Sequence, residues 1–107
     1  MEIAQYNIVL VNLNNTLGAE IQKTRPCVVI SPQEMNRHLR TIVVAPMTTR
    51  SRSYPTRVPV RHDRKAGWIA VDQIRTIDRK RIIKVLGTLN RFEIGRLKEV
   101  IREAYVE

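Results

Sequence analysis

The stretch Pro26-Cys27-Val28-Val29-Ile30 decides the fold that the sequence predicts. Four apolar residues follow a proline, and a proline is tolerated at the first position of a strand. Short apolar runs bounded by polar segments are typical of buried strands. Asn7–Leu13 and Thr41–Met47 repeat this pattern on either side of the first run. The sequence therefore predicts three apolar strands, over Asn7–Leu13, Cys27–Ile30 and Thr41–Met47.

Three more segments have strand character. Arg57–Arg61 alternates basic and apolar residues around Pro59, which favours an edge strand. Trp68–Asp72 and Arg81–Thr88 are further predicted strands, with a charged turn over His62–Gly67 before the first of them.

Two helices are expected. Ser31-Pro32-Gln33-Glu34 resembles a helix start, with Ser31 as N-cap and Pro32 at the first helical position, and this short helix ends before Thr41. The second helix begins at a capping pair of Asn90 and Glu93, with a staple between Leu89 and Ile94. Its apolar positions follow the spacing of one helical face: Leu97, Val100, Ile101, Ala104 and Tyr105.

The fold class is mostly β with a C-terminal helix. Five or six short strands without β-α-β alternation predict a small, mostly antiparallel barrel or curled sheet. The 107 residues suffice for one domain, expected over residues 1–107.

The positive charge is concentrated in the middle of the chain. The formal net charge is +9, and the segment from Arg37 to Lys65 holds eight basic residues against the single acid Asp63. Such a concentration of basic residues favours a polyanionic partner such as nucleic acid, although a generally basic surface remains an alternative.

Several classes of protein are not favoured. The single cysteine, Cys27, lies in an apolar strand and is expected to be a buried hydrophobe in a reducing compartment. No signal peptide and no apolar run of the ~20 residues that span a membrane are present, so a cytoplasmic protein without membrane contact is expected. His38 and His62 have no partners at ligand spacing, so no metal and no cofactor are expected.

Three local constellations could act on a phosphodiester. Glu20 and Arg25 lie on a loop that enters a buried strand, where the alternative is a surface ion pair. Thr48, Thr49 and Arg50 follow another strand and could bind phosphate oxygens, or form a strand-ending turn. Asp72 and Gln73 could read a base edge or orient a loop.

RNA binding is expected at two basic loops, residues 50–57 and 61–65. Tyr54 is the candidate for base stacking, with packing as its alternative. The predicted RNA-binding residues are Thr49, Arg50, Arg52, Tyr54, Arg57, Asp72 and Gln73.

Five motifs in register resemble the MazF/PemK toxins over residues 5–105. They are Gly18-Ala19-Glu20 with Thr24-Arg25-Pro26, Val28–Pro32, Val44–Thr49, Tyr54-Pro55 and Val71–Ile77. The resemblance implies an SH3-like barrel of the CcdB/MazF type, a homodimer and an acidic antitoxin as partner. It also implies metal-independent cleavage of single-stranded mRNA, which leaves a 2′,3′-cyclic phosphate and a 5′-hydroxyl.

The same resemblance implies three catalytic residues. Arg25 matches the family's catalytic arginine, Thr48 matches its hydroxyl residue, and Glu20, the candidate general base, matches the glutamate of one branch. The PemK/Kid branch has an arginine where this chain has Ala70, so the role of that arginine is not carried over. Two alternatives remain at this point: a gyrase-inhibiting toxin of the CcdB type and a non-enzymatic RNA-binding barrel.

Overall fold

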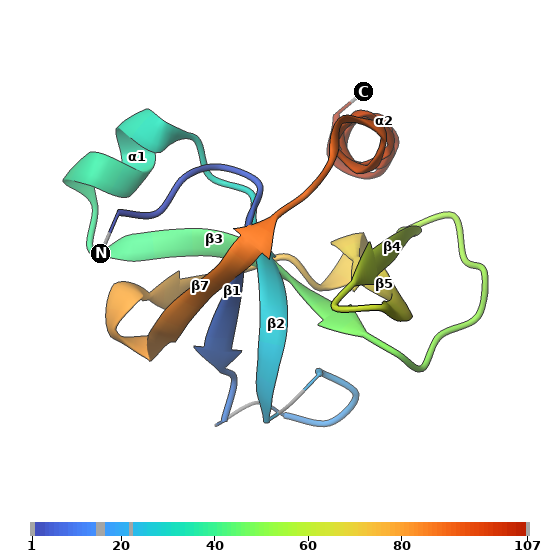
Figure 1. Ribbon diagram of the computed structural model, residues 1–107, viewed down its shortest axis with the longest axis horizontal. Coiled ribbons are helices and arrows are strands. Elements are labelled where there is room, and N and C mark those ends of the chain that lie inside the picture. The colour runs from blue at the N-terminus through green and yellow to red at the C-terminus, as the bar shows by residue number, and fades with distance from the viewer. Residues whose placement is uncertain (1, 15–16, 22, 107) are drawn as a thin grey trace.

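A curled antiparallel sheet forms the body of the molecule (Figure 1). The computed structural model describes residues 2–14, 17–21 and 23–106, and within them seven strands pair in the order β4-β5-β3-β2-β1-β7, with β6 beside β3. The strands are β1 (Asn7–Asn12), β2 (Thr24–Val29), β3 (Thr41–Thr48), β4 (Arg57–His62), β5 (Lys65–Ala70), β6 (Arg75–Asp78) and β7 (Ile82–Thr88).

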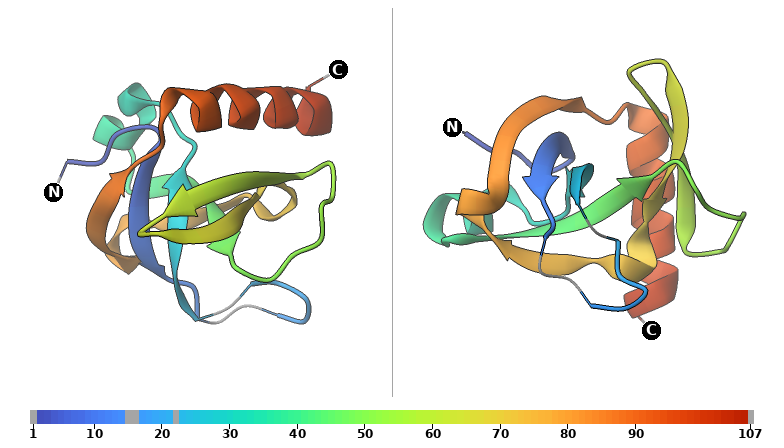
Figure 2. Two further views of the ribbon diagram at one scale, coloured as in Figure 1. Left: turned by 45° about the vertical axis from the view of Figure 1, so that its right-hand side comes forward. Right: turned by 90° about the horizontal axis from the view of Figure 1, so that it is seen from below.

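The helices are α1 (Gln33–His38) and α2 (Arg91–Tyr105), with 3₁₀ turns η1 (Val71–Gln73) and η2 (Arg79–Arg81). Figure 2 shows α2 lying across the top of the β4–β5 hairpin. The predicted fold class, mostly β with a C-terminal helix, is therefore confirmed.

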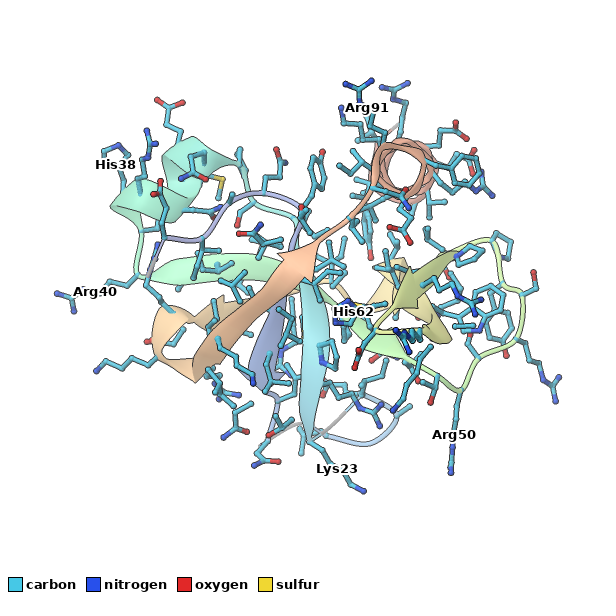
Figure 3. All side chains as sticks on the ribbon, in the orientation of Figure 1. Lys23, His38, Arg40, Arg50, His62 and Arg91 are labelled. Carbon is cyan, nitrogen blue, oxygen red and sulfur yellow. The ribbon has the colours of Figure 1, made fainter. Side chains whose placement is uncertain are left out.

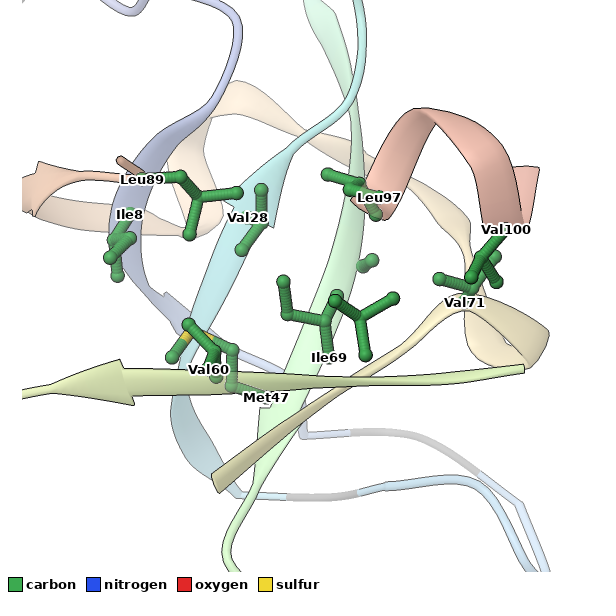
Figure 4. Close-up of a cluster of buried hydrophobic side chains, with 11 residues drawn as sticks. Ile8, Val28, Met47, Val60, Ile69, Val71, Leu89, Leu97 and Val100 are labelled. Carbon is green, nitrogen blue, oxygen red and sulfur yellow. The ribbon is translucent and has the colours of Figure 1, made fainter. Parts of the chain in front are cut away.

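The three central strands are buried on both faces. Val9, Cys27 and Val29 enter one hydrophobic cluster, whereas Ile8 and Val28, which alternate with them, enter another. Figure 4 shows the cluster that contains Ile8 and Val28, in which Leu97 and Val100 of α2 pack over residues of β2 and β5. Because each face has its own core, these strands can be apolar at consecutive positions, which explains the continuous runs in the sequence.

The start of α2 is as predicted. The Asn90 side chain accepts from the Glu93 N–H at 2.8 Å, and the Glu93 carboxylate accepts from the Asn90 N–H at 3.0 Å. Glu93 also accepts from the backbone N–H of Arg61 at 3.0 Å, which ties the helix to the edge strand β4. Leu97 and Val100 are fully buried, whereas Ala104 and Tyr105 at the end of the predicted face are exposed.

Two predicted boundaries near β2 and α1 were wrong. β2 begins at Thr24, so Pro26 lies inside the strand, where it pairs with Leu10 of β1 while pairing with β3 begins only at Cys27. Pro26 is tolerated because its missing N–H is not needed on that second side. α1 begins at Gln33, because the Ser31 hydroxyl donates to Asn36 and accepts from Val43 N instead of capping the helix.

Two further boundaries were wrong around β5. The predicted turn over His62–Gly67 shrinks to Asp63 and Arg64, and β5 runs from Lys65 to Ala70, because a two-residue hairpin loop closes at once. β6 was not predicted as a strand, since it has only four residues and one buried position. Asn15, Thr16 and Gln22 of the predicted connection between β1 and β2 lie outside the described residues.

Candidate active site

The candidate site opens where the pairing of β3 with β2 ends. β3 pairs with β2 from Val44 to Pro46, whereas Met47 and Thr48 pair only with β5, which lies on the other side of β3 in the sheet order. The β2–β3 register sets Cys27 opposite Pro46, so its continuation by two residues would place Arg25 opposite Thr48. The two strands separate before that point, which leaves space between these two side chains.

A pocket of about 250 Å³ occupies this space. Arg25 of β2 and Thr48 of β3 both line it, so the structure brings together two of the three predicted catalytic residues. Its remaining described lining divides into an apolar part (Pro26, Met47, Val60, Ala66, Gly67 and Leu86) and a polar part (Thr49, His62, Asp63 and Lys65).

Thr48 is buried, with 9% of its surface exposed, and its hydroxyl is part of a local turn. The hydroxyl donates to Arg50 O at 3.2 Å and accepts from Arg50 N at 3.1 Å. The predicted strand-ending turn is thus present at the pocket wall. Thr48 can donate to a substrate oxygen only if its single hydroxyl proton leaves the Arg50 carbonyl.

Glu20 lies outside this pocket. Its exposed carboxylate accepts from Leu17 N at 2.9 Å, and it lines a separate pocket of about 190 Å³ together with Asp72, Gln73 and Arg75. The Gln73 side-chain oxygen accepts from Ile21 N at 2.8 Å. Gln73 therefore orients the loop that carries Glu20, which was one of its two predicted roles.

Asp72 and Arg57 are paired with each other. The Arg57 guanidinium donates to both carboxylate oxygens, at 2.7 Å and 3.0 Å, and Thr56 donates to the same carboxylate at 3.0 Å. The hydrogen bond from Arg57 lowers the pKa of Asp72, and the same bond raises the pKa of Arg57. A contact of Arg57 with RNA would have to compete with this bidentate pair.

The loop between β3 and β4, residues 49–56, carries the other predicted RNA-binding residues. Thr49, Arg50, Arg52 and Tyr54 are all exposed, and Figure 3 shows Arg50 pointing away from the molecule. The Tyr54 ring lies 5.6 Å from the Arg57 guanidinium carbon, within cation–π range. The ion pair of Arg57 thus anchors one end of a loop whose side chains remain available to a ligand.

Three side chains of the pocket were not predicted as site residues. His62, Asp63 and Lys65 lie in the predicted basic loop of residues 61–65, and His62 was weighed only as a metal ligand, but all three line the pocket. Val58 and Val60 are buried while Pro59 and Arg61 are exposed. Since strand side chains alternate, this pattern places His62 on the inner face and could have identified it.

Cys27 is inert in this structure. The thiol is fully buried, and burial raises its pKa to about 12, which disfavours the nucleophilic thiolate. No three His, Cys, Asp or Glu side chains gather as metal ligands in residues 2–14, 17–21 and 23–106. Neither α1 nor α2, the helices of that part of the chain, has the length and hydropathy of a membrane-spanning segment.

Comparison with known proteins identifies the family. The family model described as PemK-like, MazF-like toxin of type II toxin–antitoxin system matches residues 4–105. The chain belongs to this family. The toxin is 34% identical over 102 residues to the endoribonuclease PemK of Escherichia coli, covering 86% of this chain and 77% of that protein.

Solved structures agree with the fold. MazF from Deinococcus radiodurans superposes with a TM-score of 0.85 at 22% identity, covering 96% of both chains. A mycobacterial endoribonuclease in complex with its cognate antitoxin superposes with a TM-score of 0.81 at 19% identity, covering 95% of this chain and 93% of that one. The predicted barrel of the CcdB/MazF type is therefore confirmed for this toxin.

Proposed function

We propose that this toxin is an endoribonuclease that cleaves single-stranded RNA at the Arg25–Thr48 pocket. The membership of the family supports the activity, and the 34% identical relative is itself an endoribonuclease. The observation that carries the location is the opening of β2 and β3 at Arg25 and Thr48, which sets a guanidinium and a hydroxyl around one pocket.

The proposed reaction uses a nucleophile that the RNA supplies. The 2′-hydroxyl loses its proton, its oxygen attacks the adjacent phosphorus, and the 5′-oxygen leaves and gains a proton. The products are a 2′,3′-cyclic phosphate and a 5′-hydroxyl, and no metal or cofactor takes part. Arginine keeps its proton to a pH above ~12, so Arg25 stabilises the phosphorane with its fork of N–H donors, and Thr48 donates to a nonbridging oxygen.

The assignment of Arg25 predicts a large loss on truncation. Arg25→Ala is expected to lower the cleavage rate by ~10²–10³, because one donor to the transition state is removed. The measurement is single-turnover cleavage of a single-stranded oligonucleotide, in EDTA and in Mg²⁺, with equal wild-type rates expected in both. A folded Arg25→Ala protein that retains the wild-type rate would contradict the assignment.

One incubation distinguishes this function from its rivals. Purified toxin is mixed with a long single-stranded RNA, and the fragment ends are mapped. Specific fragments with 5′-hydroxyl ends support the ribonuclease. Intact RNA together with inhibition of gyrase would support a CcdB-type toxin, and binding without cleavage would support an RNA-binding barrel.

The partners follow from charge and family. The net charge of +9 suits RNA and also an acidic antitoxin segment that folds over the same basic surface. We assign the toxin to the cytoplasm, where mRNA is its substrate. A homodimer is also proposed, supported by the exposed Ile83 and Val85 on β7, the terminal strand of the sheet order, and sedimentation equilibrium tests it.

A further inference from the structure

His62 has a defined place in the Arg25–Thr48 pocket. It is the last residue of β4, on the same face as the buried Val58 and Val60, and it is half-buried. Figure 3 shows its side chain reaching from the β4–β5 hairpin toward β2. On the other side, a Cβ added to Gly87 of β7 would lie 3.9 Å from His62 Cε1, so the ring also borders β7.

The hairpin turn holds this histidine at the pocket. Asp63 and Arg64 both have positive φ, 51° and 63°, as a two-residue type I′ loop requires. This turn sets His62 directly opposite Lys65 in the β4–β5 ladder. In the part of the chain that the structure describes, the ring nitrogens of His62 make no hydrogen bond, so both are available to a ligand.

The pocket needs a group that accepts a proton. A guanidinium and a threonine hydroxyl are poor general bases, and Glu20 lies in the neighbouring pocket, where it accepts a hydrogen bond from Leu17 N. Histidine is the side chain whose ordinary titration falls between about pH 5 and 8. The described charged groups around His62 are Arg25 from β2 and Asp63 and Lys65 from its own hairpin, while β3 contributes hydroxyls and β7 contributes Leu86.

We infer that His62 is the general base of the cleavage reaction, a catalytic residue that takes the role the sequence assigned to Glu20. The inference rests on the proposed ribonuclease function. An unprotonated ring nitrogen takes the proton of the 2′-hydroxyl as the bond from the 2′-oxygen to phosphorus forms. The bond from phosphorus to the 5′-oxygen breaks, its electron pair stays on that oxygen, and the oxygen takes a proton from water.

The pH dependence of the wild-type toxin is the first test. A base must be unprotonated to act, so the single-turnover rate is expected to rise with pH through the histidine range, about pH 5 to 8. The oligonucleotide carries one mapped cleavage site. A rate that falls over this range, as for an essential acid, or one that stays flat would overturn the inference while leaving the ribonuclease function in place.

Variants then locate the group. His62→Gln is expected to lower the cleavage rate by ~10²–10⁴ and to remove the rise of that rate with pH. His38→Gln is the matched control, because His38 is exposed on α1, far from the pocket (Figure 3), and it should keep both the rate and its rise with pH. Binding of the same oligonucleotide with a 2′-deoxy group at the cleavage site should change less than threefold in His62→Gln.

The remaining outcomes distinguish failure of this inference from failure of the proposed ribonuclease function. The role of His62 alone would be overturned if His62→Gln keeps both the rate and its rise with pH. The same holds if the rise is lost in Glu20→Gln but not in His62→Gln. If the rise of the rate with pH is lost in Asp63→Asn but not in His62→Gln, the Asp63 carboxylate is the general base, which would also overturn the role of His62. Wild-type toxin that cuts no single-stranded RNA would overturn both proposals. If His62→Gln does not fold, His62→Asn makes the same test, and a flat or falling wild-type profile overturns the inference in either case.

Discussion

Gly67 shows how a single residue without a side chain shapes the candidate site. It lies in β5, where a Cβ would come within 3.0 Å of the Thr48 carbonyl oxygen. Real Cβ atoms rarely approach backbone so closely, so the absence of a side chain lets β5 pack against the end of β3. The position of Thr48 at the pocket wall therefore depends on a glycine in the neighbouring strand.

Replacement of Gly67 should accordingly affect both stability and activity. Gly67→Ala is expected to lower the free energy of unfolding by about 1–3 kcal/mol, because the Thr48 backbone must move to relieve the contact. The measurement is urea unfolding, combined with RNA cleavage, which should also slow.

A second glycine gives the matched control for this substitution. Gly95 lies exposed in α2, with nothing within 4 Å of an added Cβ. Gly95→Ala should raise the free energy of unfolding by about 0.5–1 kcal/mol, since glycine is unfavourable inside a helix. Equal stability changes in the two variants would contradict the proposed contact between β5 and Thr48.

At the scale of elements, the Asp72–Arg57 pair joins η1 to the start of β4. Arg57 also donates to Ser51 at 3.1 Å, so the pair anchors the loop of residues 49–56 as well. The Asp72 side chain is 35% exposed, and solvent screening limits the contribution of the pair to about 1 kcal/mol or less.

This pair predicts a dependence of stability on pH. Its hydrogen bond lowers the pKa of Asp72 below the unfolded value, so its contribution is present above about pH 4 and is lost as pH falls through the lower folded pKa. Asp72→Asn should be less stable than wild type at pH 7, and the difference should narrow below about pH 4 in urea unfolding. A difference that is unchanged down to pH 2.5 would show that the charge of Asp72 is not its cause.

The sequence predicted the long elements well and the short ones poorly, for physical reasons. Continuous apolar runs identified β1 and β3, and the helical face with its capping pair identified α2, because each is a local pattern. β6 was missed because its four residues gain strand structure by pairing with β3, which no local pattern records. The start of β5 was missed because a two-residue turn with Asp63 and Arg64 carries no glycine.

The candidate site was predicted in part for the same reasons. Arg25 and Thr48 were both selected, but the sequence did not show that the pairing of β2 with β3 ends beside them and so opens the pocket. Glu20 lies outside that pocket and accepts from Leu17 N, within a loop whose course the sequence leaves open. His62 was predicted to lie in a turn over His62–Gly67, whereas the turn of the β4–β5 hairpin holds only Asp63 and Arg64, so His62 is a strand residue that faces the pocket.

At the scale of the whole molecule, the basic charge is expected to act through one region. The loop of residues 49–56 leaves β3 directly after Thr48, so Arg50 can contact the RNA backbone near the pocket. Arg96, by contrast, lies on α2 and is paired with Glu99 at 3.1 Å. Both substitutions, Arg50→Gln and Arg96→Gln, remove one positive charge, so together they separate local contact from net charge.

Salt dependence measures this difference. For single strands, the slope of log affinity against log salt is about −0.7 for each phosphate neutralised, so three contacts give a slope near −2. Binding of a 2′-deoxy oligonucleotide should thus weaken by about tenfold or more between 50 and 200 mM salt. Arg50→Gln should make the slope shallower by about 0.7, whereas Arg96→Gln should leave it unchanged. Equal slopes in the two variants would mean that the net charge, and not the loop beside the pocket, attracts the RNA.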